Sequence, residues 1–447
     1  MEFYGRPPLA YRSTGCAHVA DDARTRHPPK PRPMISIALS IALKTGPSKS
    51  ICLMLTDSQR DIIKATVPLL ETGGEALTTH FYKLLLSKHP EVRPLFNQAH
   101  QASGVQQRAL ANGVLQYARH IDRLEALGPL ATQIVNKHVT LQVQPEHYPI
   151  VGGCLLQAIG EVLGPEIATS AVIEAWGAAY QQLADLLIAA EQSVYDGLAN
   201  VPGGWRGARQ FRVVRKVQES TEISSFYLEP VDGERVADFV PGQYIGLRLV
   251  IDGEEVRRNY SLSAAPNGLG YRISVKRENG GKVSNYLHDH VLEGTIVDLF
   301  PPAGEFTLQE GNGPVVLISG GVGITPTVAI AEAALASERP VVFIHYARNE
   351  QVHAFGDLLD KWAARYPKFQ SYVVYEQVDS NGKRVPDTTG RPTPDHLRQW
   401  LPADEAYDAY FLGPKPFMSL VKRTLRDLGQ PDERCRYEFF GPAEALN

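Results

Sequence analysis

A glycine-rich run in the last third of this 447-residue chain has the composition that phosphate binding needs. The run covers residues 319–326 (SGGVGITP), follows an apolar segment and precedes a helical pattern. Glycines let a backbone approach a pyrophosphate, and the N-terminus of the next helix offers free N–H groups. A tight strand-to-helix turn also needs glycine for steric reasons, so the run alone leaves both interpretations open. Its candidate nucleotide contacts are Gly320, Gly321, Val322, Gly323, Ile324 and Thr325.

A second set of residues precedes this run and has side chains suited to a flat, phosphorylated ligand. Arg258, Asn259, Tyr260 and Ser261 end an expected strand, and residues 280–285 (GGKVSN) begin an expected helix. Arginine neutralises a phosphate, tyrosine stacks on a flat ring, and serine can hydrogen-bond a ring nitrogen. Each piece alone is commonplace on an exposed strand. The specific signal is their order and spacing with the later glycine run.

Histidines concentrate in the first half of the chain, where one of them could bind a metal. Residues 54–200 contain His80, His89, His100, His120, His138 and His147. A lone histidine on a helix is more often a surface or core group than a ligand. His138 stands out because residues 132–138 (TQIVNKH) form an amphipathic helical pattern and Tyr148 begins the next expected helix.

Three hydrophobic patterns predict the elements that must position these residues. Residues 54–200 repeat apolar side chains by threes and fours, with prolines near the expected helix boundaries. Residues 206–310 alternate with a period of two between turn residues, which predicts a small antiparallel β-barrel. Residues 311–447 alternate short apolar strands with helices, which predicts a parallel sheet covered on both faces. The expected fold is multidomain: all-α, then antiparallel barrel, then α/β.

Residues 1–53 differ from the rest in composition. They carry eight Lys and Arg against three Asp and Glu, and their proline-rich segment 28–33 (PPKPRP) can be neither helix nor central strand. The apolar run 35–43 is not followed by a small-residue cleavage site, which argues against a secretion signal. We expect a disordered or non-native N-terminal extension, with Met54 as the natural start and Asp57 or Ser58 as the cap of the first helix.

Composition argues against several classes of protein. Residues 54–447 carry a net charge of −9, so they lack the basic balance typical of nucleic-acid binding. No apolar run approaches the roughly 20 residues of a membrane-spanning helix. The cysteines are scattered without CxxC spacing, which argues against structural zinc and against a disulfide framework. These features favour a cytoplasmic protein with no nucleic-acid partner and no membrane span.

Residues 206–447 resemble the ferredoxin-reductase family of flavoenzymes. The resemblance is carried by the two motifs around Tyr260 and Ser284, the glycine run, Gly413-Pro414 and residues 439–442 (FFGP). In that family the first motif binds FAD, the GVG turn binds the nicotinamide nucleotide, and the C-terminal aromatic covers the flavin. The resemblance therefore implies an FAD site formed by Tyr244, Arg258, Asn259, Tyr260, Ser261, Val283, Ser284, Phe439, Phe440, Gly441 and Pro442.

Two positions bear on the nicotinamide site that the resemblance implies. Family members often have cysteine where this chain has Leu412, a position close to the nicotinamide. Arg348 could bind the 2′-phosphate of NADPH, whereas no acidic residue clearly claims the ribose of NADH. Both NADH and NADPH therefore stay open as donors.

Residues 54–200 resemble the globin domain of flavohaemoglobins, so the resemblance covers almost all of residues 54–447. Short motifs of both halves occur in the family's order, with a linker at 203–205 (GGW). The motifs are His80-Phe81-Tyr82, Leu95-Phe96-Asn97, Lys137-His138, Gln144-Pro145-Glu146-x-Tyr148, Ala175-Trp176-Gly177 and Tyr437-Glu438-x-Phe440-Gly441-Pro442.

The resemblance implies a haem b site with His138 as the proximal iron ligand. Tyr148 and Glu191 match the partners that hold the second nitrogen of this imidazole. A carboxylate in that position pushes electron density toward the iron and favours activation of O₂ over its storage. Glu191 lies late on the last long helix, so a solvated position on that helix is the alternative.

On the other side of the haem, Tyr82 and Gln106 match the residues that hydrogen-bond O₂. A shift of one residue in helix register would exchange Gln106 and Gln107. Further matches are Phe96 and Leu110 for packing on the haem, and Lys137 and Glu438 for tuning the flavin and haem potentials, with solvated charges as the alternative for the last two.

The function that the resemblance implies is that of a nitric oxide dioxygenase, which detoxifies NO. Electrons would pass from NAD(P)H through FAD to haem, and NO and O₂ would be converted to nitrate. Two alternatives share this electron path: a haem-linked reductase of hydroperoxide or ferric iron, and a sensor globin for O₂ or NO with an attached reductase. The expected partners are the small molecules NO and O₂, and the expected state is a monomer.

Overall fold

The computed structural model describes residues 55–97, 101, 103–378, 382–403, 405–441 and 446, all of which belong to one structural unit spanning residues 34–447. The expectations for residues 1–53 and for Pro442 fall outside these ranges.

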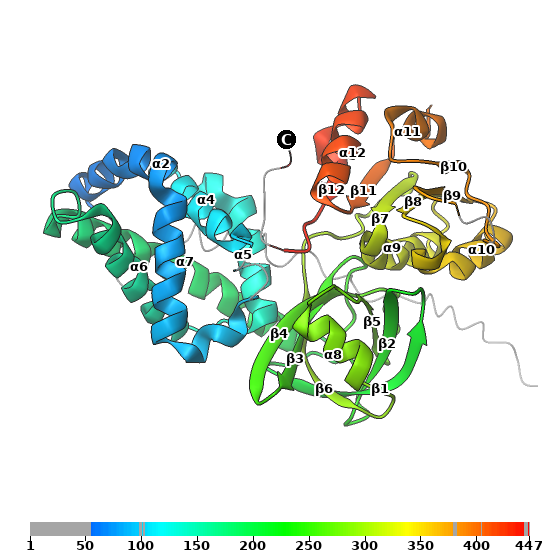
Figure 1. Cartoon of the computed structure of the whole chain (residues 1–447), viewed down its shortest axis with the longest axis horizontal. Coiled ribbons are helices and arrows are strands. Elements are labelled where there is room, and N and C mark those ends of the chain that lie inside the picture. Colours follow the sequence, from blue (N-terminus) through cyan, green and yellow to red (C-terminus); the bar gives the residue numbers. More distant parts are fainter. Residues whose placement is uncertain are drawn as a thin grey trace, which may run out of the picture. The chain divides into compact units, whose positions relative to one another are not determined.

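The first part of the described chain is helical (Figure 1). Its α-helices are α2 (Asp57–Lys88), α4 (Val105–Arg119), α5 (Gly128–Leu141), α6 (His147–Leu163) and α7 (Ser170–Asn200), with 3₁₀ turns η1 (Pro90–Leu95) and η2 (Leu124–Leu127). Thr56 caps α2 in place of the predicted Asp57 or Ser58. Its hydroxyl accepts from the Gln59 N–H, and the Gln59 side chain accepts from the Thr56 N–H. The predicted cap lies one or two residues too far along the chain, because threonine, aspartate and serine all suit an N-cap.

Two apolar clusters hold these helices together. Helices α2, α4, α6 and α7 share a core that includes Phe81, Leu85 and Trp176. Helix α5 packs on α7 through a second cluster, which includes Val135 and Leu187. The helix that carries His138 is therefore held by α7, the helix that carries Glu191.

An antiparallel six-stranded sheet follows, with the strand order β4-β3-β6-β1-β2-β5. Its strands are β1 (Arg209–Gln218), β2 (Ile223–Pro230), β3 (Tyr244–Ile251), β4 (Glu254–Ser261), β5 (Tyr271–Lys276) and β6 (Ile296–Ala303), and helix α8 (Lys282–His290) lies between β5 and β6 in sequence. Alternate residues such as Phe211, Val213 and Leu247 fill one core. This period of two is the pattern that predicted the sheet.

The last part of the chain is a parallel six-stranded sheet with the order β10-β9-β8-β7-β11-β12. Its elements are β7 (Val315–Gly320), η3 (Gly321–Gly323), α9 (Ile324–Ala336), β8 (Val341–Ala347), η4 (Glu350–Val352), α10 (Gly356–Arg365), β9 (Phe369–Tyr375), β10 (Thr388–Thr389), α11 (Pro394–Trp400), β11 (Asp408–Leu412), α12 (Lys415–Asp427), η5 (Asp432–Arg434) and β12 (Cys435–Tyr437). Helices α9 and α10 pack on one face of the sheet, and α11 and α12 pack on the other. The predicted multidomain fold class is confirmed.

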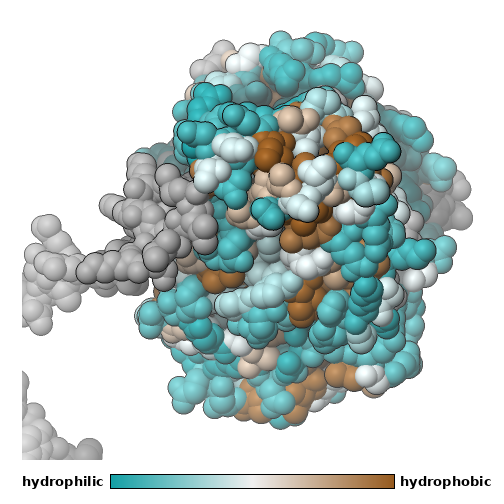
Figure 2. Space-filling view, turned by 90° about the vertical axis from the view of Figure 1, so that its left-hand side faces the viewer, coloured by the Kyte–Doolittle hydropathy of each residue, from teal (hydrophilic) through white to brown (hydrophobic). Residues whose placement is uncertain are grey.

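The surface of the described chain is mixed in character. Figure 2 shows hydrophilic residues over most of one face, with hydrophobic residues in small separate groups. No helix within the described ranges has both the length and the apolar character needed to cross a membrane.

Candidate functional site

The buried group around His138 joins three helices. His138 lies on α5, Tyr148 in the first turn of α6 and Glu191 on α7. The Nδ1–H of His138 donates to Oε1 of Glu191 at 2.7 Å, and the Tyr148 hydroxyl donates to the same oxygen at 2.6 Å. Glu191 is only 2% exposed, so its carboxylate lies with the histidine and not in solvent. Burial and the nearby negative charge of Glu191 raise the pKa of Tyr148, which keeps its hydroxyl a donor.

The donor set around His138 fits an axial haem ligand. Because Nδ1 donates a hydrogen bond to a carboxylate, Nε2 is the ring nitrogen available to bind a metal. The hydrogen bond from Nδ1 to Glu191 fixes both the tautomer and the orientation of the ring. An imidazole held in this way is the usual arrangement for a histidine that binds haem iron.

Tyr82, on α2, carries a buried hydroxyl that is hydrogen-bonded to the side chain of Gln106. Burial raises the pKa of this phenol, so it stays protonated and can donate to a ligand. The Tyr82 and Phe96 rings meet edge to face with centroids 5.7 Å apart, and Leu110 packs in the same cluster. The neighbouring Gln107 instead donates to the carbonyl of Gln101, so the register favours Gln106 at Tyr82.

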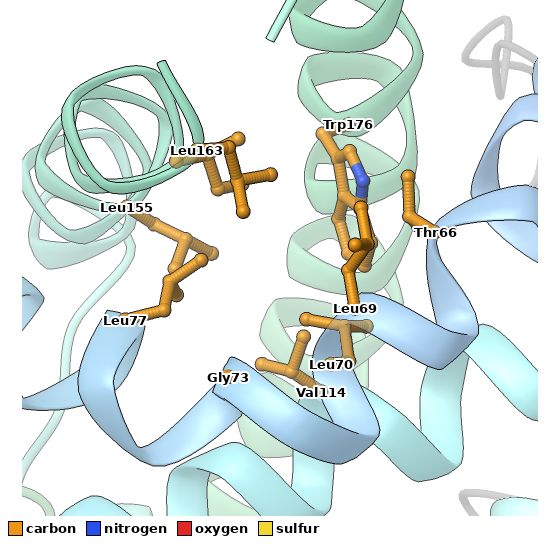
Figure 3. A pocket seen from close by; sticks show the side chains of 10 residues that line it. Thr66, Leu69, Leu70, Gly73, Leu77, Val114, Leu155, Leu163 and Trp176 are labelled. Carbon is orange, nitrogen blue, oxygen red and sulfur yellow. The ribbon is translucent and has the colours of Figure 1, made fainter. Parts of the chain in front are cut away.

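An apolar cavity of about 20 Å³ lies among α2, α4, α6 and α7 (Figure 3). Its lining is Thr66, Leu69, Leu70, Gly73, Leu77, Val114, Leu155, Ile159, Leu163 and Trp176. The hydroxyl of Thr66 donates to a backbone carbonyl within α2, so it offers the cavity little polarity. Leu77 and Val114 lie one helical turn from Phe81 and Leu110. The space exceeds the roughly 10–15 Å³ that one water-sized molecule needs.

Helix α5 contacts the β-barrel directly through hydrogen bonds and close packing. The Asn136 side chain accepts from the Gly304 N–H at 3.0 Å and donates to Glu305 at 3.1 Å. Arg257 donates to the carbonyl of Leu141 at the end of the helix. A Cβ at position 246 would collide with the carbonyl of Thr140, so the strand approaches the helix closely only because residue 246 is glycine. These contacts join the His138 helix to the domain with the flavin motif.

Lys137 also connects α5 to the C-terminal segment, since its ammonium donates to the carbonyl of Gly441. Burial lowers the pKa of Lys137, and the charge of Glu438 opposes this change. Burial raises the pKa of Glu438 to about 7, against the pull of Lys137. Two half-buried, interacting charges therefore lie beside the contact between the helix and the C-terminal segment.

The flavin motif on β4 leaves two groups whose chemistry calls for a ligand. The amide oxygen of Asn259 is buried without a hydrogen-bond partner among the described residues. The guanidinium of Arg258 donates to the neighbouring carbonyl of Arg257, and its burial lowers its pKa. A buried cation and an unpaired amide fit a phosphorylated flavin. Tyr260 and Ser261 complete the strand, with Ser261 buried beside the half-buried tyrosine.

The other expected flavin contacts surround this strand in sequence and in space. Tyr244 pairs with Ser261 across β3 and β4. Val283 and Ser284 are buried in the first turn of α8, and the Ser284 hydroxyl is held by the Glu278 N–H and the Gly281 carbonyl. Helix α8 has no side-chain cap, which leaves its first N–H groups for an anion.

Two phenylalanines end the described C-terminal segment in different environments. Phe439 is half-buried and meets Tyr437 edge to face. Phe440 is 49% exposed, so its ring is accessible at the surface of the described chain. Gly441 accepts from Lys137, as described above.

The glycine run forms the turn between β7 and α9. Gly320 ends the strand, Gly321 has the positive φ of 55° that glycine favours, and Gly323 leads into the helix. A Cβ at Gly323 would lie 2.4 Å from the carbonyl of Leu412, so glycine is required there. Val322, Ile324 and Thr325 continue the turn, and α9 has no side-chain cap. This strand–turn–helix arrangement is the context that a nucleotide phosphate requires.

The structure places the two variable positions of the nicotinamide site differently. Leu412 is buried at the end of β11 and packs against the turn through Gly323. Arg348 follows β8 and forms an ion pair with Glu222 of the β-barrel domain. A 2′-phosphate would have to compete with this carboxylate.

Sequence reasoning missed the residues that attach α5 to the barrel: Asn136, Thr140, Gly246, Arg257 and Glu305. One signal was available, because Asn136 is a polar residue on the buried side of an amphipathic helix and stands next to Lys137-His138. Its partners lie far away in sequence, so no local pattern identifies them.

The chain matches three protein families by sequence. These are Globin over residues 79–187, the oxidoreductase FAD-binding domain over residues 210–308 and the oxidoreductase NAD-binding domain over residues 317–423. These matches confirm the predicted haem, FAD and nicotinamide-nucleotide cofactors.

Full-length relatives share the same three parts. The flavohemoproteins of Pseudomonas aeruginosa and Pseudomonas putida are both 64% identical to this chain, over 88% of its length and 100% of theirs. A crystal structure of flavohemoglobin from Malassezia yamatoensis with bound FAD and heme covers 87% of this chain and 100% of its own, with a TM-score of 0.76 and 27% identity. The chain therefore belongs to the flavohemoprotein family, in which a globin is joined to an FAD- and NAD-binding oxidoreductase.

Proposed function

We propose that this flavohemoprotein is an NAD(P)H-dependent nitric oxide dioxygenase. One NAD(P)H supplies two electrons, with which two NO and two O₂ become two nitrate ions. The observation that carries the proposal is the buried group in which His138 and Tyr148 both donate to one oxygen of Glu191. When bound, haem b and FAD supply the electron transfer and the oxygen chemistry, and the protein sets their positions and electrostatics.

On the proximal side, Glu191 gives the His138 imidazole partial imidazolate character and so makes it a stronger electron donor. Tyr148 holds the carboxylate in place by donating to the same oxygen. A histidine backed by a carboxylate favours activation of O₂, whereas a histidine backed by a neutral acceptor favours reversible binding. This difference supports a dioxygenase over a sensor.

On the distal side, Tyr82 orients O₂ through its protonated hydroxyl, and Gln106 holds that hydroxyl in position. Phe96 and Leu110 lie in the same apolar cluster and would pack against the haem and keep water away from it. The apolar cavity near Leu77 suits O₂ and NO, which are small and weakly polar. These residues bind and orient both substrates.

The contacts that join α5 to the barrel would hold the two domains together for electron transfer from flavin to haem. Asn136 contributes to them through its hydrogen bonds to Gly304 and Glu305. Lys137 and Glu438 would tune the potentials of the haem and the flavin through their half-buried charges.

In the reductase half, Arg258 would neutralise the FAD phosphates, Tyr260 would stack on the ring system and Ser261 would hydrogen-bond to it. Tyr244, Asn259, Val283, Ser284 and residues 439–442 complete the FAD site. The turn 320–325 binds the pyrophosphate of NAD(P)H. A monomer in the cytoplasm agrees with this assignment, and the free thiols of Cys154 and Cys435 suit a reducing compartment.

The test is an aerobic pulse of NO given to the full-length protein, loaded with haem and FAD and supplied with NADH or NADPH. We expect rapid loss of NO, formation of nitrate in equal amount and oxidation of half an equivalent of NAD(P)H. Tight O₂ binding without turnover would instead indicate the sensor. NADH-driven reduction of hydroperoxide or ferric iron, without nitrate, would indicate the other reductase.

A further inference from the structure

Four buried polar side chains lie together at the carboxyl ends of β7, β8 and β9. Ser319, His345 and Tyr375 come from the three strands, and His353 comes from the segment before α10. None of them is more than 6% exposed. On the face covered by α9 and α10, the apolar residues of β7 and β8 are followed by Ser319 and His345, and on β9 Val373 precedes Tyr375.

Hydrogen bonds and ring contacts link the four side chains into one network across the sheet. His345 Nδ1 and the Ser319 hydroxyl are 2.8 Å apart, and so are His353 Nδ1 and the Tyr375 hydroxyl. The two imidazole rings lie against each other with centroids 4.9 Å apart and an angle of 31° between their planes. We call these four residues the histidine network.

The histidine network makes the fold less stable than an apolar core of the same shape would. The Nε2 atoms of His345 and His353 are both buried without a hydrogen-bond partner among the described residues. A buried polar atom without a partner lowers stability, and apolar residues of similar shape would avoid that loss. A polar network kept at this edge therefore calls for a role beyond packing.

The position of the histidine network identifies that role. Ser319 directly precedes Gly320, the residue from which the glycine turn starts. Three glycines make this turn flexible, so its N–H groups must be fixed before they can bind a phosphate tightly. On the side of β11, the Leu412 carbonyl packs against Gly323. On the side of β8, the backbone pairing extends to Gly320 and Tyr346, and the hydrogen bond between the side chains of His345 and Ser319 adds a further polar contact at the strand end.

We propose that His345 is a positioning residue for NAD(P)H, which acts through Ser319 to hold the glycine turn in its nucleotide-binding conformation, with His353 and Tyr375 supporting its ring. This inference rests on the proposed function only in taking NAD(P)H as the electron donor.

Two variants of His345 in the full-length, cofactor-loaded protein separate positioning from packing. His345→Leu removes the bond to Ser319, whereas His345→Asn keeps a polar atom close to the place of Nδ1. The probe is tetrahydronicotinamide adenine dinucleotide, which binds but cannot donate hydride, and its Kd is measured by calorimetry. A second readout is the KM and kcat for NADH with ferricyanide as acceptor, which needs neither NO nor haem.

We expect His345→Leu to raise both the Kd of the analogue and the KM for NADH about tenfold, with kcat changed less than twofold. A tenfold change corresponds to about 1.4 kcal/mol, the size of one hydrogen bond. His345→Asn should stay within about threefold of the wild type. His396→Leu is the matched control, because His396 has a buried unpartnered Nδ1 but packs on Trp400 at the opposite face of the sheet. It should leave Kd and KM unchanged.

The proposal is overturned if His345→Leu binds the analogue as the wild type does, or if the Leu and Asn variants weaken binding equally. Should His345→Leu fail to fold, Ser319→Ala decides, because it removes only the hydroxyl. A rise of threefold or more in Kd would support the proposal, and an unchanged Kd would contradict it. Failure of nitrate production would leave these binding results untouched, so the two proposals fail separately.

Discussion

Histidine rings are hydrogen-bonded through Nδ1 in both halves of the chain, but within the described residues only the globin half pairs such a ring with a carboxylate. His138 donates to Glu191, which also accepts from Tyr148. In the α/β domain, His345 and His353 are bonded to hydroxyls, and neither is hydrogen-bonded to a carboxylate within the described chain. The same residue type is thus set in two different electrostatic environments.

The group at Nδ1 decides what each ring can do. A carboxylate increases the electron density of the imidazole, which matters when the other nitrogen binds a metal. A hydroxyl adds no charge, and burial lowers the pKa of His353 to about 4 and that of His345 well below its ordinary value. These two rings therefore stay neutral at physiological pH. We therefore infer that His138 acts by donating electron density to the iron, whereas His345 acts by positioning the glycine turn.

Replacing His138 gives the largest expected effect. His138→Ala removes the axial nitrogen, so haem binding through iron and all NO turnover should be lost. Reduction of ferricyanide by NADH should persist, because the reductase half has its own cores. Haem content, the visible spectrum and ferricyanide activity are the measurements. His120→Ala is the matched control in the same helical domain and should retain haem. Full NO turnover in His138→Ala would show that another residue is the ligand.

The next effect comes from removing only the charge of Glu191. Both His138 and Tyr148 donate to Oε1, so Glu191→Gln keeps an acceptor for both bonds. Changes to groups behind a metal ligand commonly cost 10–100-fold. We expect NO dioxygenation to fall tenfold or more, with haem content and flavin reduction unchanged.

The matched control for Glu191 is Glu161, whose carboxylate meets His80 at 2.5 Å on the surface. Glu161→Gln breaks a histidine–carboxylate pair that does not involve His138, so NO turnover should stay normal. Equal losses in the two variants would remove the special role of Glu191.

A smaller effect is expected where a neutral hydroxyl is the contributing group. Ser261→Ala would remove the proposed hydrogen bond to the flavin, worth about 0.5–1.5 kcal/mol, so flavin reduction should slow by up to roughly tenfold. Stopped-flow reduction with NADH measures it, and Ser225→Ala, which removes another buried barrel hydroxyl, is the control. An unchanged rate in Ser261→Ala would place Ser261 outside the flavin site.

The smallest expected effect concerns the stability of the protein in acid and not its turnover. The folded state lowers the pKa of His353 to about 4 from its ordinary 6.5, through burial and the charge of Arg384, against Asp360. The unfolded chain therefore binds more protons below pH 6.5, and stability falls as the pH drops toward about 4. His353 alone contributes on the order of 3 kcal/mol.

This pH dependence is measured as the unfolding of the full-length protein by calorimetry between pH 6.5 and about 4. His353→Phe cannot take up this proton, so its unfolding temperature should fall less steeply than that of the wild type. If the unfolding temperatures of His353→Phe and the wild type fall in parallel, His353 takes up its proton equally in the folded and unfolded states and does not cause the loss of stability.

The periodic elements could be read from the sequence because their signals are local. The strand β7 and the turn 320–323 follow from apolar spacing and glycine placement within a few residues, and α6, predicted to begin at Tyr148, begins one residue earlier at His147. Even so, the cap of α2 was misplaced, because Thr56, Asp57 and Ser58 have nearly equal preference for this position.

The contacts of the site could not be derived from local pattern. Residue spacing left Glu191 facing either the haem pocket or water, and a partner 53 positions away decides its direction. Asn136 and Glu305 are 169 positions apart, and their contact depends on how the globin and barrel pack. The histidine network escaped notice because His345 and His353 carry no motif and gain meaning only beside Ser319.

The most direct test of the electronic role of His138 is resonance Raman spectroscopy of the ferrous, haem-loaded protein. The iron–histidine stretching band reports how strongly the imidazole donates to the iron. If the Glu191 carboxylate strengthens that donation, the band of Glu191→Gln should move to lower frequency than in the wild type, while Glu161→Gln should match the wild type. An unmoved band in Glu191→Gln would contradict the account, because Glu191 would then hold the ring in place without acting on the iron.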